Sequence, residues 1–277
     1  METPARAGAG RMSTAADHSP LLQLEHCTLQ FGGLTAVSDL SLQLGGPEIV
    51  GLIGPNGAGK TTVFNLITGV YRPTRGEIRY RGASLVGQRP WEITSHGIAR
   101  TFQNIRLFPS LTVFDNVRVA FHLHLKHDAR HSLWRGRGFL REETEIEGQV
   151  MDMLEIFHLG KFRDASAKGL SYGDQRRLEI VRALATRPTL LLLDEPAAGM
   201  NPTEKAALMK LIEFVEQKYR IAILLVEHDM QVVMGICRRI IVLDYGVKIA
   251  EGTPEEVRAD QKVIEAYLGQ AAGEPQS

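Results

Sequence analysis

GPNGAGKT, from Gly54 to Thr61, decides the fold of this 277-residue chain. The stretch fits the pattern G-x-x-x-x-G-K-[ST], whose glycines let the backbone curl so that successive N–H groups point inward at a phosphate chain. An apolar run, EIVGLI (Glu48–Ile53), precedes the stretch, and apolar residues at helical spacing follow it. We therefore expect a buried strand, a phosphate-binding loop and a helix whose N-terminus faces the phosphates.

The side chains of this loop have distinct predicted roles. Lys60 brings a full positive charge to the β- and γ-phosphates, the Thr61 hydroxyl is a ligand for Mg²⁺, and Thr62 contacts the α-phosphate. The residues predicted to bind nucleotide here are Gly54, Pro55, Asn56, Gly57, Ala58, Gly59, Lys60, Thr61 and Thr62. The alternative is a glycine-rich turn that binds nothing, and the complete motif in its strand-to-helix context argues against it.

Two further apolar runs end in polar residues suited to phosphate chemistry. TLLLLD (Thr189–Asp194) ends in Asp194, which we expect to hold Mg²⁺, and Glu195 follows as a general base or as the group that polarises the attacking water. IAILLVE (Ile221–Glu227) is followed by His228, whose imidazole can donate to the γ-phosphate or to that water. Alternatively, the two acids form a solvated strand end and the histidine is structural. The carboxyl ends of strands hold the ligands of open α/β sheets, which favours the functional interpretation.

The alternation of short apolar runs with helical patterns predicts an α/β fold, a P-loop NTPase core with a mainly parallel sheet. LLQLEHCTLQF (Leu21–Phe31) and RIIVLDYGVKIAEG (Arg239–Gly252) have an antiparallel character, which predicts an antiparallel β subdomain, and DYG offers a hairpin turn. Helical spacing in the middle of the chain predicts a helical insertion. We expect a disordered tail at 1–20, one domain at 21–270 with its α/β core at about 21–103 and 169–270 and its helical subdomain at about 104–168, and a loose tail at 271–277.

Composition narrows the functional classes. Lys and Arg number 32, as do Asp and Glu, so no net positive charge favours nucleic acid or an anionic membrane, and no nucleic-acid partner is expected. Cys27 and Cys237 lack C-x-x-C spacing, which argues against a zinc or disulfide framework. The longest apolar runs are far shorter than the roughly 20 residues that cross a bilayer. We expect a soluble chain, or one bound to a membrane only through a partner.

A second anion site is predicted at LSYGDQRRLEI (Leu170–Ile180). SYGD fits a capping box, so one interpretation is that Ser171 simply caps a helix. That interpretation leaves Gly173 unexplained, because glycine in a helix costs about 0.5–1 kcal/mol relative to alanine. Close approach of a phosphate to this backbone would explain the glycine.

Taken together, these motifs resemble those of the ATP-binding-cassette (ABC) ATPases, from about Leu22 to Gly269. Gly54–Thr61 resembles the Walker A loop, Leu190–Asp194 the Walker B strand, Glu195 the catalytic carboxylate and His228 the switch histidine. In ARTFQNIRLF (Ala99–Phe108), Gln103 resembles the Q-loop glutamine, and the resemblance implies that it contacts Mg²⁺ or the lytic water. Without the resemblance, Gln103 would be interpreted as a surface residue.

The same resemblance identifies two segments that cross between paired cassettes. The signature is Leu170, Ser171, Tyr172, Gly173 and Asp174, and the D-loop is Ala198, Gly199, Met200 and Asn201. In the family, the signature of one cassette closes over the ATP on the Walker A loop of another. Tyr172 and Asp174 depart from the common Leu-Ser-Gly-Gly-Gln, and Asn201 stands where aspartate is common, which bears on communication between the sites.

Phe31 lies where the family places an aromatic ring that stacks on adenine. The alternative interpretation is a core phenylalanine. The apolar stretch Phe102–Val117 likewise has two interpretations, a dock for membrane subunits or ordinary core of the helical insertion.

A closer resemblance, in YGDQRRLEI, DEPAAGMNP, EHDM, GTPEEV and AYLG, is to the ATPase of branched-chain amino-acid importers. It implies ATP and Mg²⁺ as cofactors, ATP-driven dimer closure, permease subunits, a second ATPase subunit, identical or related, and indirectly a solute-binding protein. The resemblance implies that the protein lies at the cytoplasmic face of the inner membrane, bound peripherally through the permease subunits. The alternatives are the ATPases of lipopolysaccharide export or of amide or urea import, and an ABC ATPase outside transport.

Overall fold

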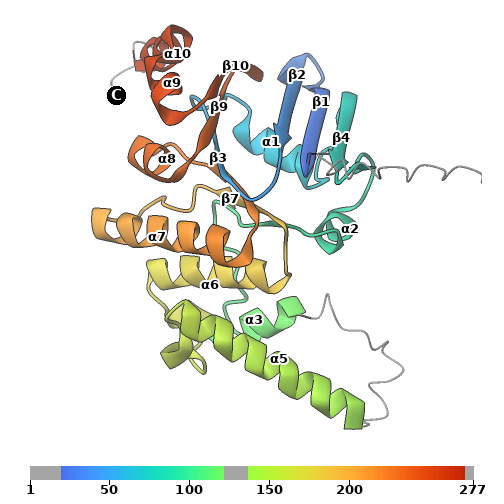
Figure 1. Cartoon of the computed structure of the whole chain (residues 1–277), viewed down its shortest axis with the longest axis vertical. Coiled ribbons are helices and arrows are strands. Elements are labelled where there is room, and N and C mark those ends of the chain that lie inside the picture. Colours follow the sequence, from blue (N-terminus) through green and yellow to red (C-terminus); the bar gives the residue numbers. More distant parts are fainter. Residues whose placement is uncertain (1–19, 122–136, 272–277) are drawn as a thin grey trace, which may run out of the picture.

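Two β-sheets with helices around them make up the part of the chain that the computed structural model describes, residues 20–121 and 137–271 (Figure 1). The predicted tails, 1–20 and 271–277, lie outside this part except for Pro20 and Ala271. In Figure 1 the antiparallel sheet lies at the upper right, and the helices α3 (Val113–Phe121) and α5 (Arg137–Ile156) lie at the lower end.

The larger sheet has the strand order β10-β9-β3-β8-β7-β6. Its strands are β3 (Ile49–Ile53), β6 (Ile98–Arg100), β7 (Leu190–Asp194), β8 (Ala222–Val226), β9 (Arg239–Asp244) and β10 (Val247–Gly252). Neighbours pair in parallel except for β9 and β10, which form an antiparallel hairpin at the edge. The predicted parallel sheet and its three predicted strands are confirmed.

The smaller sheet is antiparallel, in the order β2-β1-β4-β5. Its strands are β1 (Leu22–Phe31), β2 (Leu34–Leu44), β4 (Arg75–Tyr80) and β5 (Ala83–Ser84). The antiparallel character expected of Leu21–Phe31 is therefore confirmed. Arg239–Gly252 is a hairpin, as predicted, but β9 pairs in parallel with β3, so this hairpin belongs to the larger sheet.

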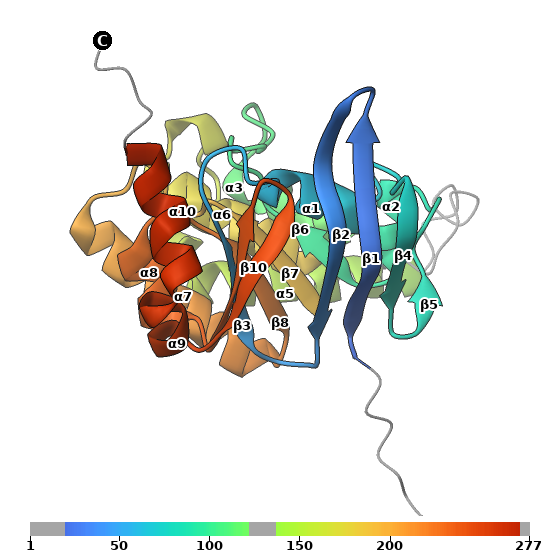
Figure 2. The ribbon, with the colours of Figure 1, turned by 90° about the horizontal axis from the view of Figure 1, so that it is seen from above.

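Side chains of the larger sheet alternate between two cores. Ile49 and Ile53 of β3 face the core that includes α6 (Tyr172–Ala185), α7 (Pro202–Tyr219), α8 (Met230–Ile236), α3 and α5. Val50 and Leu52 belong to the core shared with α1 (Lys60–Ile67) and the smaller sheet. Figure 2 shows α1 beside β2 of that sheet. Each of these four side chains is at most 2 % exposed, and burying a side chain of this size contributes about 1.5–3 kcal/mol. Burial on both faces explains why the parallel strands are continuous apolar runs.

The helices cover both faces of the larger sheet. They are α1 (Lys60–Ile67), α2 (Pro90–Ser95), α3 (Val113–Phe121), α5 (Arg137–Ile156), α6 (Tyr172–Ala185), α7 (Pro202–Tyr219), α8 (Met230–Ile236), α9 (Pro254–Ala259) and α10 (Gln261–Ala271), with short 3-10 turns η2 (Gly160–Phe162) and η3 (Ala167–Gly169). α3 packs against both α5 and α6. The bounds of the helical insertion, about 104–168, stay a prediction. Among the described helices none has the length and apolar composition needed to span a membrane.

Candidate active site

The phosphate loop (Gly54–Thr61) joins the buried strand β3 to helix α1. Gly54, Gly57 and Gly59 have φ values of 149°, 79° and 99°, a backbone region that favours glycine. Gly59 is the N-cap of α1 and offers no side chain to the N–H groups of the first turn. These N–H groups and the helix dipole together form the geometry of an anion site.

The turn between β9 and β10 is hydrogen-bonded to this loop. The Gly246 N–H donates to the Ala58 carbonyl at 3.0 Å, and the Gly246 carbonyl accepts from the Ser38 N–H at 2.8 Å. A Cβ on Gly246, where φ is 79°, would lie 2.6 Å from the carbonyl oxygen of Ala36. The predicted DYG turn therefore requires its glycine, and it positions the phosphate loop.

Lys60 lies buried in the loop. Its ammonium donates to the carbonyl oxygens of Gly54 and Pro55 at 2.6 and 2.9 Å. Burial lowers the pKa of Lys60, while the carboxylates of Glu195 and Asp194 act in the opposite direction. The phosphate loop and the end of β7 therefore share one electrostatic site.

The two acids at the end of β7 differ in their surroundings. Asp194 is 3 % exposed, and its Oδ2 forms an ion pair with Arg100 at 2.8 Å. Arg100 in turn lies over the rings of Phe64 and Phe102. Glu195 has φ of 46°, a conformation that is uncommon outside glycine and is concentrated at functional sites.

Gln103 and His228 approach the same oxygen of Glu195. Gln103 Nε2 donates to Glu195 Oε2 at 2.8 Å, and His228 Nδ1 lies 3.8 Å from that oxygen. The three residues follow β6, β7 and β8, which are neighbours in the larger sheet. The sheet order therefore brings together the three residues predicted to take part in hydrolysis.

Ser171 caps α6 and remains exposed. Its Oγ accepts from the Asp174 N–H at 3.2 Å and donates to the Asp174 carboxylate at 2.7 Å, so the predicted cap is present. A Cβ on Gly173 would contact only the Glu204 side chain, at an ordinary 3.6 Å. Since no steric reason for this glycine exists within the described part of the chain, the approach of a phosphate stays a prediction.

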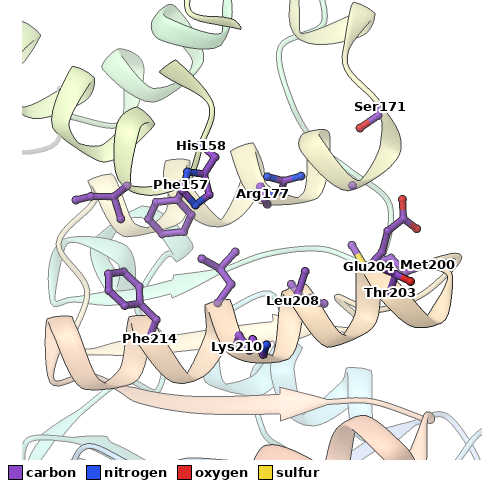
Figure 3. A pocket seen from close by; sticks show the side chains of 14 residues that line it. Phe157, His158, Ser171, Arg177, Met200, Thr203, Glu204, Leu208, Lys210 and Phe214 are labelled. Atoms are coloured by element: carbon purple, nitrogen blue, oxygen red, sulfur yellow. The ribbon is translucent and has the colours of Figure 1, made fainter. Parts of the chain in front are cut away.

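The signature and the D-loop line one groove between α6 and α7 (Figure 3). This groove of about 520 Å³ has Ser171 and Met200 near one end and apolar side chains of α7 along its length. Asn201 caps α7, since its Oδ1 accepts from the Glu204 N–H at 3.0 Å, while the Glu204 carboxylate accepts from the Asn201 N–H at 2.9 Å. Asparagine caps a helix about as well as aspartate does, so this departure keeps the cap.

Phe31 lies at the end of β1, 45 % exposed, with its ring edge-on to Tyr71 at a centroid distance of 5.1 Å. The alternative interpretation of a core phenylalanine is therefore wrong. Stacking on adenine stays a prediction.

Sequence reasoning missed four buried charged residues of this site: Arg100, Arg176, Glu179 and Glu227. Each is buried. Glu179 and Glu227 lie within apolar patterns, one on the inner face of α6 and one directly after the run of β8. A carboxylate at a position that the pattern assigns to the core was the available signal, because buried charges are rare without a partner.

Glu227 connects the end of β8 to the segment before the D-loop. It accepts from the Ala197 N–H at 2.7 Å and from the His228 N–H at 3.2 Å. Burial raises the pKa of Glu227, and these N–H groups partly offset that rise. The acid thus fixes the backbone on either side of the site.

Comparisons with known proteins agree with this geometry. A family model described as ABC transporter matches residues 37–198, and one described as branched-chain amino acid ATP-binding cassette transporter matches residues 247–273. The chain is 45 % identical to the high-affinity branched-chain amino acid transport ATP-binding protein BraF of Pseudomonas aeruginosa and 47 % identical to LivG of Escherichia coli. Each match covers 91 % of this chain and 99 % of the relative.

Solved structures give the same result. The ADP conformation of an ATP-binding cassette of an ABC transporter superposes with a TM-score of 0.78 at 29 % identity, covering 91 % of this chain and 99 % of that one. A dimeric post-hydrolysis state of a cassette bound to ADP and phosphate superposes with a TM-score of 0.71 at 25 % identity, covering 84 % and 98 %. The chain belongs to the ABC transporter family, in which it is a nucleotide-binding, ATP-hydrolysing cassette.

Proposed function

We propose that the chain is the ATP-hydrolysing subunit of an importer for branched-chain amino acids. The observation that carries this proposal is the similarity to branched-chain amino acid transport ATP-binding proteins over 91 % of the chain. A separate family model matches residues 247–273, which include β10, α9 and α10. ATP acts as a ligand that favours a closed pair of cassettes, and its hydrolysis removes that preference.

In this proposal Glu195 polarises the attacking water, and Gln103 and His228 hold the water and the γ-phosphate in place. Their approach to one oxygen of Glu195, at 2.8 and 3.8 Å, supports these roles. Gln103 presents an amide and His228 an imidazole, and neither is a permanent cation. The Glu195 carboxylate therefore remains able to accept a proton.

Mg²⁺ is proposed to bind at Thr61, Gln103 and Asp194. Their hydroxyl, amide and carboxylate oxygens suit a hard cation that also binds nucleotide phosphates. Among the described residues no cluster of three or more His, Cys, Asp or Glu side chains could hold a metal. When bound at the proposed site, the cation would neutralise charge on the phosphates. Arg100 fixes one oxygen of Asp194 and thereby orients the carboxylate.

Two cassettes, identical or related, are proposed to pair head to tail. The signature, Leu170–Asp174, then closes over the partner's ATP, and the D-loop, 198–201, crosses the interface. The exposed Ser171, the sterically unexplained Gly173 and the dimeric state of a similar cassette support this arrangement.

The permease subunits are proposed to dock beside α3 and α6. A groove of about 360 Å³ there includes Phe108, which is 47 % exposed, and Arg106. Val113 and Val117 are fully buried, so the stretch Phe102–Val117 divides: its first part offers a surface and its second part is core. Docking places the chain peripherally at the cytoplasmic face of the inner membrane, and a solute-binding protein acts on it only through the permeases.

Phe31 is proposed to stack on the adenine ring. Its ring is half-exposed and packs in a T-shaped arrangement with Tyr71, and an exposed aromatic ring can offer a flat π-face to a base.

The test is to purify tagged wild-type and Glu195→Gln chains from solubilised membranes with ATP present, identify the associated chains, and measure leucine uptake after reconstitution into liposomes. We expect two multi-spanning permeases, a second cassette, and ATP-dependent uptake that Glu195→Gln abolishes and the surface control Glu255→Gln retains. A complex that hydrolyses ATP but moves no leucine, isoleucine or valine would contradict the substrate. Recovery of ribosomes or DNA without membrane proteins would contradict transport.

A further inference from the structure

Tyr172, the first residue of α6, lies between the D-loop and the second turn of that helix. A Cβ built on Gly199 would lie 3.6 Å from the Tyr172 ring, so the ring lies beside the backbone of Gly199. One turn along, the Arg176 guanidinium carbon lies 5.6 Å from the centroid of the same ring, and its NH2 donates to the tyrosine hydroxyl at 3.3 Å. The ring, 44 % exposed, thus joins Gly199 to Arg176.

Arg176 holds the backbone of the Q-loop, defined here as residues 101–106. Its guanidinium donates to the carbonyl of Phe102 at 2.6 Å and to the carbonyl of Gln103. Its ion-pair partner Glu179, at 2.9 Å, accepts from the N–H groups of Phe102 and Arg106 at 3.4 and 3.3 Å. The helix therefore bonds to both donors and acceptors of this loop.

This ion pair is among the most deeply buried features of the described chain. Arg176 and Glu179 are 1 % and 2 % exposed. A buried ion pair is weak by itself as a source of stability, because desolvation of both charges offsets their attraction. The main effect of the pair is instead to hold the Q-loop backbone through hydrogen bonds. The planar, bidentate guanidinium of Arg176 makes these bonds rigid.

Gln103 completes the connection, because its side chain donates to Glu195 while its carbonyl is held by Arg176. We propose that Tyr172 and Arg176 are positioning residues that transmit the state of one ATP site to the hydrolytic residues of the other. The inference rests on the head-to-tail pairing proposed above. In that pairing the signature contacts the partner's ATP, whereas Gln103 and Glu195 serve the chain's own ATP.

The physical step is a small shift of α6. When a phosphate of the partner's ATP binds at Ser171 and Gly173, the first turn of α6 moves together with Tyr172. Arg176 belongs to the same helix and donates to the Gln103 carbonyl, so its movement displaces that carbonyl. The side-chain amide of Gln103 then changes its position relative to Glu195. A glycine at position 172 has no ring to contact Gly199 or Arg176, so the tyrosine adds a contact that the common signature lacks.

The experiment compares Tyr172→Ala and Tyr172→Phe with wild type in the assembled complex. The control is Phe214→Ala, which removes a ring of similar exposure, 40 %, on α7. We expect Tyr172→Ala to lower kcat by about tenfold and to lower the Hill coefficient for ATP toward unity. Tyr172→Phe keeps the ring and retains most of kcat.

A direct structural measurement accompanies the kinetics. In wild type, binding of a non-hydrolysable ATP analogue should change hydrogen exchange of the amides of residues 102–106, and Tyr172→Ala should reduce that change. Unaltered thermal unfolding establishes that the variant is folded.

Two results would overturn the proposal: a Tyr172→Ala complex with wild-type kcat and Hill coefficient, or equal losses in Phe214→Ala. Failure of the pairing itself has a different signature, since wild type would then show neither ATP-dependent association of cassettes nor cooperative hydrolysis.

Discussion

The guanidinium of Arg100 lies 2.8 Å from the carboxylate of Asp194, and both side chains are almost completely buried. Arg100 also donates to Asn65 Oδ1 at 2.7 Å, which connects the end of β7 to helix α1. Arg100 therefore compensates the charge of Asp194, the acid proposed to bind Mg²⁺, and orients its carboxylate. No sequence motif indicates this arginine.

Arg100→Met removes this charge and keeps an unbranched side chain between Phe64 and Phe102. Breaking a buried pair from one side leaves Asp194 uncompensated, so the free energy of unfolding should fall by about 3–5 kcal/mol. Mg·ATP should stabilise this variant more than wild type, because the cation then compensates the acid. Urea unfolding with and without Mg·ATP measures both effects.

The matched control is Arg79→Met. Arg79 Nε lies 3.9 Å from Glu25 Oε2, and each side chain is 43 % exposed. Arg79→Met should therefore lower the free energy of unfolding by less than about 1 kcal/mol. Equal losses of unfolding free energy in Arg100→Met and Arg79→Met would contradict the stabilising role of the buried Arg100–Asp194 pair.

Two glycines of the phosphate loop should differ sharply on substitution by alanine. A Cβ on Gly54 would lie 2.0 Å from the carbonyl oxygen of Leu243, whereas a Cβ on Gly57 meets no atom within 4 Å. Gly57→Ala should therefore cost only the backbone strain of its φ of 79°, about 1–2 kcal/mol. Gly54→Ala should displace β9 or the loop and abolish nucleotide binding. Thermal unfolding and a fluorescent-nucleotide titration separate the two cases, and similar stability losses would contradict the steric argument.

The pH dependence of ATP affinity should respond to Glu195. The folded pKa of Lys60 is lowered by burial and raised in part by Glu195 and Asp194, so Glu195→Gln lowers it further. Only protonated Lys60 attracts phosphate, hence affinity falls as pH rises through this pKa, and in Glu195→Gln the fall should begin at a lower pH. ATP dissociation constants from about pH 7 to pH 10 would show the displacement. Glu255→Gln serves as the control, and superimposable curves for Glu195→Gln and wild type would contradict the electrostatic role.

Phe108→Asp should uncouple hydrolysis from transport. The Phe108 backbone stays anchored because its N–H donates to Asn116 Oδ1 at 2.9 Å and its carbonyl accepts from Asn116 Nδ2 at 3.0 Å. The exposed side chain can therefore change without loss of the fold, whereas Leu107 packs against the core and would not tolerate a charge. ATP hydrolysis should persist while uptake is lost in reconstituted complexes. Ile264→Asp, an exposed position on α10, should leave uptake intact, and normal uptake by Phe108→Asp would contradict docking at this groove.

Local signals explain which parts of the site the sequence could predict. The phosphate loop depends on glycines and a lysine within eight consecutive residues, so its motif determines its structure. β6 spans only Ile98–Arg100 and becomes a strand because it pairs with β7, which no local pattern indicates. The placement of β9 beside β3 is likewise decided by packing of the whole sheet.

The buried ion pairs were hidden for the same physical reason. Arg100 bonds to an acid 94 residues away, and Arg176 to carbonyls 73 and 74 residues away. An arginine on its own is expected at the surface, and only a partner brought close by the fold makes its burial favourable.

Ser171→Arg should prevent closure of a cassette pair while preserving ATP binding to the single chain, because Ser171 is exposed and lies outside the phosphate loop. Arginine at this position also removes the Ser171 side-chain cap of α6, at a cost of about 1 kcal/mol. Ser171→Ala is therefore the necessary comparison, because it loses the cap but leaves room for a phosphate. In a Glu195→Gln background that retains ATP, size-exclusion chromatography should show ATP-dependent pairing for Ser171→Ala and none for Ser171→Arg. If Ser171→Arg instead abolished nucleotide binding by the monomer, the signature would belong to the chain's own ATP site and the head-to-tail arrangement would be wrong.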